Sequence, residues 1–303
     1  MTASDEQTLA RALESCRAVT RRRARNFYYG LKLTPEPQRS AIYSIYAWMR
    51  RADDFVDAGT GESEAGRREI AAFGAATEAA LAGRVTENEH LWVALADTAR
   101  RFDLPPESFH LVLEGQLKDL TGAQYETFSD VRDYCYHVAS TVGLICISVW
   151  GYSDPAACEL AVDRGIAFQL TNILRDYKED YDAGRVYLPA ENFARHGLTP
   201  QQLRQWADPA ACRAMIGELA ARTRSFYEHS APLDRMIGRC GRPTLWAMTT
   251  IYEALLSKIE RSPRRIVARR RLRLSSLRKG SIALRARLFA GRGVDAPAAV
   301  SEA

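Results

Sequence analysis

The sequence predicts an all-α protein, a single domain of long packed helices. Apolar residues recur at helical spacing over many stretches, and no alternating apolar and polar run of useful length indicates a strand. Glycine and proline are sparse, and they separate the periodic stretches instead of interrupting them. No internal repeat with a fixed period is present. These observations favour a bundle of helices around one interior.

Each expected helix is delimited by end signals. The prolines that begin at Pro35 open a helix that ends at the glycines after Asp57. Ser129 or Asp130 is the expected N-cap of a later helix. Gly184 breaks the helix that precedes it. The expected helices span about residues 34–57, 64–81, 89–101, 104–121, 128–150, 156–180, 209–230 and 241–260.

Composition is that of an ordinary globular protein. The chain has 303 residues, 47% of them hydrophobic, which permits one large helical domain. No run reaches the ~18 apolar residues of a membrane span, and the polar N-terminus has no signal-peptide pattern, so we expect a cytoplasmic location. The six cysteines show no close pairing and are expected to be reduced core residues. We expect an N-terminal lead over residues 1–20, a main domain over 21–273 and a basic tail over 274–303 with a disordered end.

Positive charge is concentrated near the C-terminus. Residues 264–303 contain eleven arginines and lysines and two acidic residues, a net charge of +9, whereas the remaining residues carry −4. The basic residues alternate with leucine, isoleucine and phenylalanine, a pattern typical of a segment that rests on anionic lipid headgroups, here at the inner face of the membrane. A solvated helix with a disordered end is the alternative. Nucleic acid is not an expected partner, because no aromatic platform or recognised binding module accompanies the charge.

Two oxygen-bearing stripes carry most of the functional information. Asp53 and Asp57 are four residues apart and therefore share a helix face, and Asn172, Asp176 and Asp180 repeat the same step twice. Both stripes adjoin apolar runs, where carboxylates repel one another unless a cation neutralises them. Hard oxygen ligands without histidine or cysteine suit Mg²⁺, which completes its shell with water and substrate phosphates. One such stripe is usually a solvated face, but two indicate a diphosphate held by metal between two helices.

Arginines accompany both stripes. Arg50, Arg51 and Arg175 are placed to meet phosphate oxygens that the metal leaves uncovered. The alternative is that these arginines only pair with the neighbouring aspartates. The five histidines show no spacing typical of a metal site. A glycine-rich phosphate loop and a dinucleotide-binding fingerprint are absent.

Several long motifs resemble the squalene and phytoene synthase family. They are Y-A-W-M-R-R-A-D-D-F-V-D at residues 46–57, Y-C-Y-H-V-A-S-T-V-G at 134–143, Q-L-T-N-I-L-R-D-Y-K-E-D at 169–180 and G-R-V-Y-L-P at 184–189. The resemblance covers about residues 26–269. It implies the all-α isoprenoid synthase fold, with the two acidic motifs on opposite walls of a central cavity.

The resemblance also implies roles for single residues. It makes Asp53, Asp57, Asn172, Asp176 and Asp180 ligands of Mg²⁺, with Mn²⁺ as a substitute. It implies catalytic roles for tyrosines that line the cavity, where ring faces stabilise carbocations, namely Tyr46, Tyr134 and Tyr252. It implies substrate contacts for Arg23, Arg25, Phe27, Arg50, Val138, Val142, Gly143, Gln169, Arg175, Tyr187 and Arg269.

Structural alternatives stand beside these roles. Any one of the tyrosines is also typical of a core position with a satisfied hydroxyl. Gly143 is explained equally well by a helix–helix contact. The basic run over residues 21–25 is explained by a solvated face. Glu114 and Asp119 are weaker candidates for the site.

The implied activity is head-to-head condensation of two prenyl diphosphates through a cyclopropyl diphosphate. Formation of phytoene from geranylgeranyl diphosphate is favoured, because the D-D-x-V-D and G-R-V-Y-L-P forms look more like bacterial phytoene synthases. Farnesyl diphosphate to presqualene diphosphate or squalene is the alternative, and only squalene would require NADPH. The alternative of another class is a non-catalytic protein that binds isoprenoids or acts in assembly. The aspartates of both acidic motifs are retained, which counts against this alternative.

Overall fold

The computed structural model describes residues 3–24, 28–57, 64–85, 89–120 and 124–290, and its regular structure is helical. The only β-type contact within these residues is an isolated bridge between Tyr152 and Ile237. The all-α prediction is therefore confirmed. None of the described helices is long and apolar enough to cross a bilayer.

The main helices agree with the expected stretches, with an additional helix, α1, near the N-terminus. They are α1 (Ala3–Arg23), α3 (Gln38–Asp57), α4 (Glu64–Leu81), α5 (His90–Arg101), α6 (Pro106–Leu120), α7 (Phe128–Cys135), α8 (Thr141–Trp150), α9 (Ala157–Asp182), α12 (Pro209–His229) and α14 (Arg242–Arg261). The shorter elements are α2 (Tyr28–Leu31), η2 (Tyr136–Ser140), α10 (Ala190–Arg195), α11 (Pro200–Gln205), α13 (Leu233–Met236), η3 (Pro263–Val267), α15 (Ser276–Arg285) and η4 (Ala286–Ala290).

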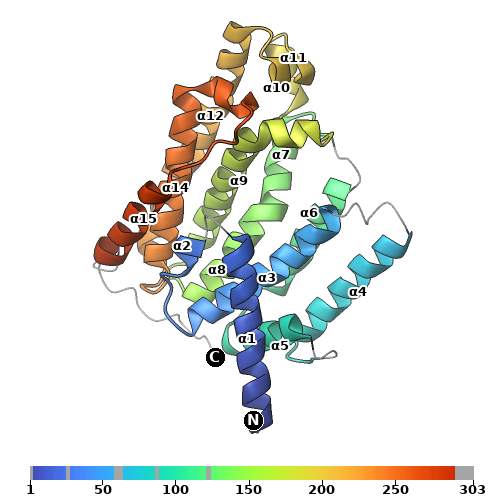
Figure 1. The fold of residues 1–303 in the computed structure, drawn as a ribbon, viewed down its shortest axis with the longest axis vertical. Coiled ribbons are helices and arrows are strands. Elements are labelled where there is room, and N and C mark those ends of the chain that lie inside the picture. Colours follow the sequence, from blue (N-terminus) through green and yellow to red (C-terminus); the bar gives the residue numbers. More distant parts are fainter. Residues whose placement is uncertain (1–2, 25–27, 58–63, 86–88, 121–123, 291–303) are drawn as a thin grey trace.

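Helices α8 and α9 run through the middle of the bundle. Helices α3 and α6 pack on one side of this pair, whereas α12 and α14 pack against α9 on the other (Figure 1). The N-terminal helix α1 contacts α3 and α5, and it buries Ala12, Cys16 and Thr20. Gly184, with φ of 80°, follows α9 and allows the chain to turn back toward the bundle.

The predicted helix over residues 128–150 differs from expectation in two ways. Its N-cap is Thr127, not Ser129 or Asp130, because Asp130 occupies the third helical position. The Thr127 amide donates to the Asp130 carboxylate over 2.7 Å, and the Thr127 hydroxyl accepts from the Asp130 amide over 3.3 Å, which is a capping box. The helix is also interrupted, because η2 is a π-helical turn between α7 and α8.

Close packing fixes this π turn. A Cβ atom added to Gly165 of α9 would lie 2.5 Å from the Cα atom of Ser140, and one added to Gly115 of α6 would lie 2.7 Å from Val138 Cγ1. Only glycine at both positions permits this approach. The turn that carries Val138 is therefore held between α6 and α9.

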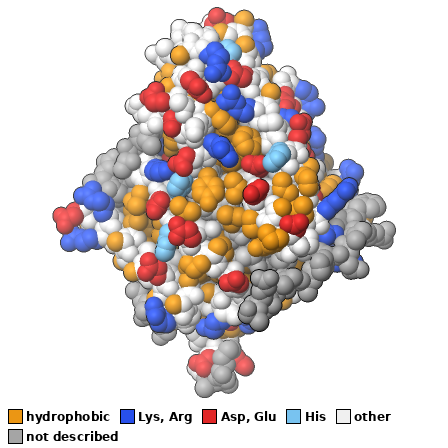
Figure 2. All heavy atoms as spheres, turned by 180° about the vertical axis from the view of Figure 1, so that it is seen from behind, with side chains coloured by type: hydrophobic (Ala, Val, Ile, Leu, Met, Phe, Trp, Pro, Cys, Tyr) orange, Lys and Arg blue, Asp and Glu red, His pale blue; other side chains and the backbone are white. Residues whose placement is uncertain are grey.

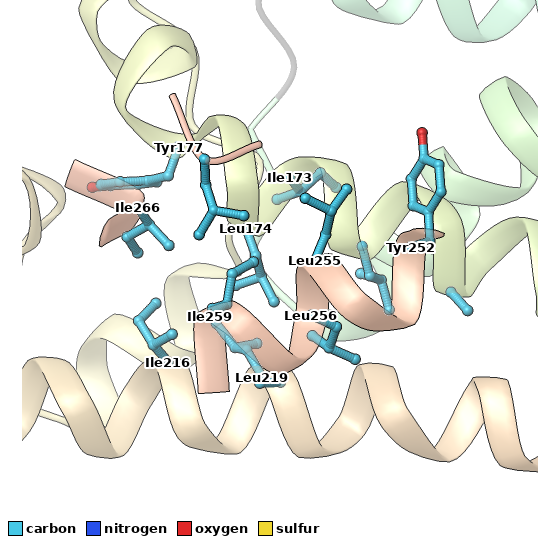
Figure 3. Close-up of a cluster of buried hydrophobic side chains, with 14 of the residues drawn as sticks. Ile173, Leu174, Tyr177, Ile216, Leu219, Tyr252, Leu255, Leu256, Ile259 and Ile266 are labelled. Atoms are coloured by element: carbon cyan, nitrogen blue, oxygen red, sulfur yellow. The ribbon is translucent and has the colours of Figure 1, made fainter. Parts of the chain in front are cut away.

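The buried apolar side chains form two separate clusters. The first joins the C-terminal half of α9 to α12 and α14, and Figure 3 shows its members converging around Leu174, Leu255 and Ile259. The second joins α3 to α1, α5, α6 and α8 around Trp48. A domain of ordinary construction has one contiguous core. Here the helices that carry the two acidic motifs, α3 and the C-terminal half of α9, belong to different clusters.

Candidate active site

The first acidic stripe lies in the last turns of α3. Asp53 Oδ1 accepts a hydrogen bond of 2.7 Å from the Gln116 side chain of α6, and Asp53 Oδ2 lies 3.4 Å from an Arg50 nitrogen. Asp57 is the last residue of α3, and its side chain lies outside the described residues. The α6 amide thus orients one carboxylate of the stripe.

Asp54 brings two of the predicted phosphate-binding arginines together. Arg50 donates to Asp54 Oδ1 from Nε over 3.2 Å and from Nη2 over 2.9 Å, and Arg23 of α1 pairs with the same oxygen. Both guanidinium groups are therefore kept beside the first stripe. The predicted contacts Arg25 and Phe27 lie outside the described residues.

The second stripe lies on α9, where two guanidinium groups form ion pairs with the carboxylate of Asp176. Arg175 donates to Asp176 from Nε over 2.8 Å and from Nη2 over 2.6 Å. Arg271 also pairs with both oxygens, with its Nε at 2.6 Å. Burial alone would raise the pKa of Asp176, but the two arginines outweigh burial and hold this pKa below its usual range.

Arg271 is a site residue that the sequence prediction missed. The predicted phosphate contact was Arg269, which is exposed and forms no ion pair within the described part of the chain. Both residues belong to one run of basic residues between η3 and α15. The run was a visible signal, but it did not identify which arginine reaches α9.

Two further oxygen groups of the second stripe are poorly satisfied. Burial, followed by the charge of Asp176, raises the pKa of Asp180 to about 7. Asn172 Nδ2 donates to Gln169 over 3.2 Å, but Asn172 Oδ1 is buried and has no partner within the described residues. A buried acceptor and a half-buried carboxylate with a raised pKa mark a place where a cation is favourable.

The donor set fits Mg²⁺ or Mn²⁺. It consists of carboxylate and amide oxygens, without nitrogen or sulfur ligands. Within the described ranges, no group of three or more carboxylate, imidazole or thiol side chains could hold a metal ion by itself. Mg²⁺ in proteins commonly uses one or two carboxylates and takes the rest of its shell from phosphate and water.

Tyr252 of α14, predicted to line a cavity, adjoins the second stripe. Its ring packs against Phe168 with a centroid distance of 4.8 Å, and Figure 3 shows its hydroxyl pointing away from the apolar cluster. Burial raises the pKa of Tyr252, while hydrogen bonding to Arg175 and Asn172 opposes that rise. The hydroxyl is thus directed toward the polar groups of α9.

Tyr46 lies within electrostatic range of the first stripe and of Tyr252. It is half-buried on α3, and its pKa is raised to about 12 by burial, with Arg50 lowering it and Asp53 and Tyr252 raising it. Its neighbours therefore include the first stripe and, across the bundle, the tyrosine beside the second stripe. Two of the three predicted catalytic tyrosines lie in one electrostatic environment.

The third predicted tyrosine, Tyr134, belongs to an aromatic group. Its ring stacks on Tyr187, with centroids 5.0 Å apart and an interplanar angle of 17°, and Tyr125 completes the group. The Tyr134 hydroxyl donates to Asp119 over 2.9 Å. Burial raises the pKa of Asp119, and hydrogen bonds from Tyr134 and Tyr187 oppose it. Helix α6 thus supports both sides of the site, through Gln116 and Asp119.

Arg185 is a second residue that the sequence prediction did not assign, although it belongs to the G-R-V-Y-L-P motif. Its Nε atom is buried and has no hydrogen-bond partner within the described residues. Its charge lowers the pKa of both Asp119 and Asp180. The loop after α9 therefore brings a partly unsatisfied cation between the aromatic group and the second stripe.

The predicted apolar contacts occupy both clusters. Val138 packs partly buried against the first cluster and Val142 against the second. A Cβ atom on Gly143 would lie 3.3 Å from the Ala161 carbonyl oxygen. The close approach of α8 to α9 is therefore sufficient to explain this glycine, without a substrate contact.

A helical bundle with two arginine-accompanied carboxylate stripes is suited to diphosphate esters and divalent cations. The squalene/phytoene synthase family model matches residues 20–278. The 15-cis-phytoene synthase of Synechococcus elongatus is 36% identical over 267 residues, covering 84% of this chain and 86% of that protein. The phytoene synthase of Mycobacterium tuberculosis is 34% identical over 282 residues, covering 88% and 87%.

Solved structures show the same similarity. A dehydrosqualene synthase in complex with ligand superposes with a TM-score of 0.81 at 27% identity, covering 93% of this chain and 97% of that one. A squalene synthase from Alicyclobacillus acidocaldarius superposes with a TM-score of 0.75 at 26% identity, covering 84% and 94%. The chain belongs to the squalene/phytoene synthase family and is a prenyltransferase.

Proposed function

We propose that this enzyme condenses two molecules of geranylgeranyl diphosphate head to head and releases phytoene. The observation that carries the proposal is the placement of two oxygen-bearing stripes on helices from separate core clusters, with arginines beside each. The phytoene synthases among the relatives, about 35% identical over most of the chain, support the choice of product.

The polar residues divide into metal ligands and diphosphate contacts. Asp53, Asp57, Asn172, Asp176 and Asp180 would hold Mg²⁺, or Mn²⁺ in its place. Bound metal would neutralise the negative charge that develops on the departing diphosphate. Planar guanidinium groups suit the uncovered phosphate oxygens, and the candidates are Arg23, Arg50, Arg175, Arg185 and Arg271.

The aromatic residues would protect the carbocations. Departure of one diphosphate leaves an allylic cation, which the double bond of the second substrate attacks, and proton loss gives a cyclopropyl diphosphate. A second departure, rearrangement and proton loss give phytoene. Ring faces of Tyr46, Tyr134 and Tyr252 stabilise positive charge. The apolar walls that include Val138 and Val142 exclude water, which would otherwise quench the cations.

A second candidate uses the fifteen-carbon substrate. It would convert farnesyl diphosphate to presqualene diphosphate or, with NADPH as hydride donor, to squalene. The similarity to a dehydrosqualene synthase and a squalene synthase favours this alternative.

Product analysis tests both candidates. The purified enzyme is incubated with each prenyl diphosphate and Mg²⁺, with and without NADPH, and the hydrocarbons are extracted. We expect phytoene from geranylgeranyl diphosphate without NADPH. If the enzyme converts farnesyl diphosphate but not geranylgeranyl diphosphate, the second candidate replaces the first. If it converts neither substrate, the proposed condensation is refuted.

A further inference from the structure

Exposed apolar side chains are concentrated on one part of the surface. Six large apolar side chains are exposed among the described residues, and four of them are Tyr29 of α2, Leu277 and Leu284 of α15 and Leu288 of η4. Their exposed fractions are 49%, 88%, 59% and 48%. Helices α2 and α15 contact each other, and η4 continues α15. The four side chains therefore belong to one region.

Helix α15 is fixed in place, and its leucines point away from its support. Ile282 and Ala286 are buried, where α15 and η4 pack on α14. At ~100° per residue, Leu277, Leu284 and Leu288 fall on one stripe, roughly opposite these buried residues. We call these three residues the leucine face. Such a face on a docked helix is available to an external apolar partner.

Basic residues border the leucine face. In helical projection Arg278 and Arg285 lie on one side of it and Arg287 on the other. Residues 264–290 contain no acidic residue. Burial, followed by the charge of Arg273, lowers the pKa of Lys279, which is consistent with crowded positive charge. In the view of Figure 2, from behind Figure 1, acidic and basic side chains are interspersed around apolar ones.

We propose that the leucine face, together with Tyr29, rests on an anionic phospholipid bilayer. The leucine side chains enter the boundary between lipid headgroups and acyl chains. The arginine side chains keep their aliphatic stems in the apolar layer while their guanidinium groups bind lipid phosphates. Positive charge beside the leucines complements an anionic surface and opposes pairing with a second copy of the same basic face. The motive rests on the proposed function, because its product is a hydrocarbon that is insoluble in water and must pass from the protein interior to an apolar phase.

Vesicle co-sedimentation of the full chain tests this surface without substrate, so failure of the proposed reaction would not affect it. The vesicles contain phosphatidylcholine alone or mixed with phosphatidylglycerol. We expect binding only to the mixed vesicles, and weaker binding as salt rises. Replacing Arg278, Arg285 and Arg287 by Gln should weaken binding ~100-fold, at roughly 5-fold for each basic residue.

Matched controls separate this region from the rest of the surface. Replacing the leucine face by Gln at all three positions should weaken binding about 10-fold or more, whereas Val85→Gln, an exposed apolar residue after α4, should not. Arg67→Gln combined with Arg213→Gln, both exposed elsewhere, should change binding less than 2-fold.

Three results would overturn the proposal. Equal binding to both kinds of vesicle would remove the electrostatic part, and unchanged binding of the leucine variant would remove the apolar part. The third result has two parts: the parent protein binds no vesicles, and light scattering shows that it is a dimer which the leucine variant converts to a monomer. That result would assign the leucine face to contact with a second copy of this chain. Circular dichroism verifies that each variant is folded.

Discussion

Arg271 and Arg175 both form ion pairs with the carboxylate of Asp176, although Arg271 lies 95 residues further along the sequence. In this arrangement both carboxylate oxygens already accept charged hydrogen bonds. A divalent cation that binds Asp176 must displace at least one of the two guanidinium groups. Arg271 is the more exposed of the two, with 38% of its side chain accessible against 10% for Arg175, so we expect Arg271 to move. Its release would place a guanidinium group beside the incoming diphosphate.

Arg271→Gln should therefore change metal binding and turnover in opposite directions. Without the competing pair, the Mg²⁺ concentration at half-saturation should fall roughly 5-fold, the value of a ~1 kcal/mol exposed pair. Turnover at saturating Mg²⁺ should fall, because one phosphate contact is lost. Thermal shift in a Mg²⁺ titration measures the first effect and product formation the second.

Arg269→Gln is the matched control for this prediction. Arg269 lies two residues earlier in the same basic run and is exposed. It should leave the Mg²⁺ titration unchanged. If Arg269→Gln reproduces both effects and Arg271→Gln neither, the observed pair has no role and the sequence-based assignment of Arg269 holds.

Asp53→Asn and Asp176→Asn should each reduce turnover ~10²-fold or more while the protein stays folded. Each substitution keeps the side-chain shape but removes a charge from a proposed metal ligand. Asp182→Asn makes the same change on α9 outside the stripe, where Asp182 pairs with Lys178 and Arg204, and it should keep nearly full activity. Near-normal turnover of the first two variants at limiting Mg²⁺ would contradict the site assignment.

The stability of the metal-free protein should depend on Asp180. Its pKa of about 7 in the folded protein lies above the ordinary value of 3.8, so the folded state binds this proton more tightly than the unfolded state. The associated stability is present below about pH 4 and is lost as pH rises toward 7. Asp180→Asn stays neutral at every pH, so with EDTA its Tm should match that of the parent near about pH 3 and exceed it near about pH 8. A parallel offset at both values would contradict the raised pKa.

The long helices were predictable because their signals are local. The apolar periodicity that ends at Leu81 and the glycines that flank it predict α4 within its observed bounds. The π turn was not predictable, since the apolar pattern through Tyr136–Ser140 does not differ visibly from an α-helix. Contacts from Gly115 and Gly165, distant in sequence, hold it.

The site was predictable to a similar extent. The stripes follow from four-residue spacing, which is a property of one helix. The identity of the arginine that pairs with Asp176 does not follow from the sequence, because the basic run after η3 contains several arginines. Which of them reaches α9 depends on how the run is anchored, and the burial of Leu272 and Leu274 in the first cluster provides that anchor.

Gly165→Ala should destabilise the fold at the π turn. The added methyl group would lie 2.5 Å from a backbone atom of Ser140, so α9 and η2 must separate, at a cost of about 1–3 kcal/mol. Gly217→Ala in α12 meets nothing within 4 Å and should stabilise by about 0.5–1 kcal/mol, because alanine is the better helix former. Urea titration gives both free energies of unfolding. Equal effects of the two substitutions would show that the close contact is not maintained in solution.

Substrate length should depend on the wall near Val142. This residue is partly buried on α8, one turn before the fully buried Ile145. The twenty-carbon substrate gains binding free energy over the fifteen-carbon one only if its extra isoprene unit is buried, at ~0.8 kcal/mol per methylene. Val142→Phe should therefore lower kcat/KM for geranylgeranyl diphosphate more than for farnesyl diphosphate. Val93→Phe makes the same change on α5, against the same cluster, and should leave the ratio of the two kcat/KM values unchanged. An equal loss for both substrates in Val142→Phe would place the end of the prenyl chain elsewhere.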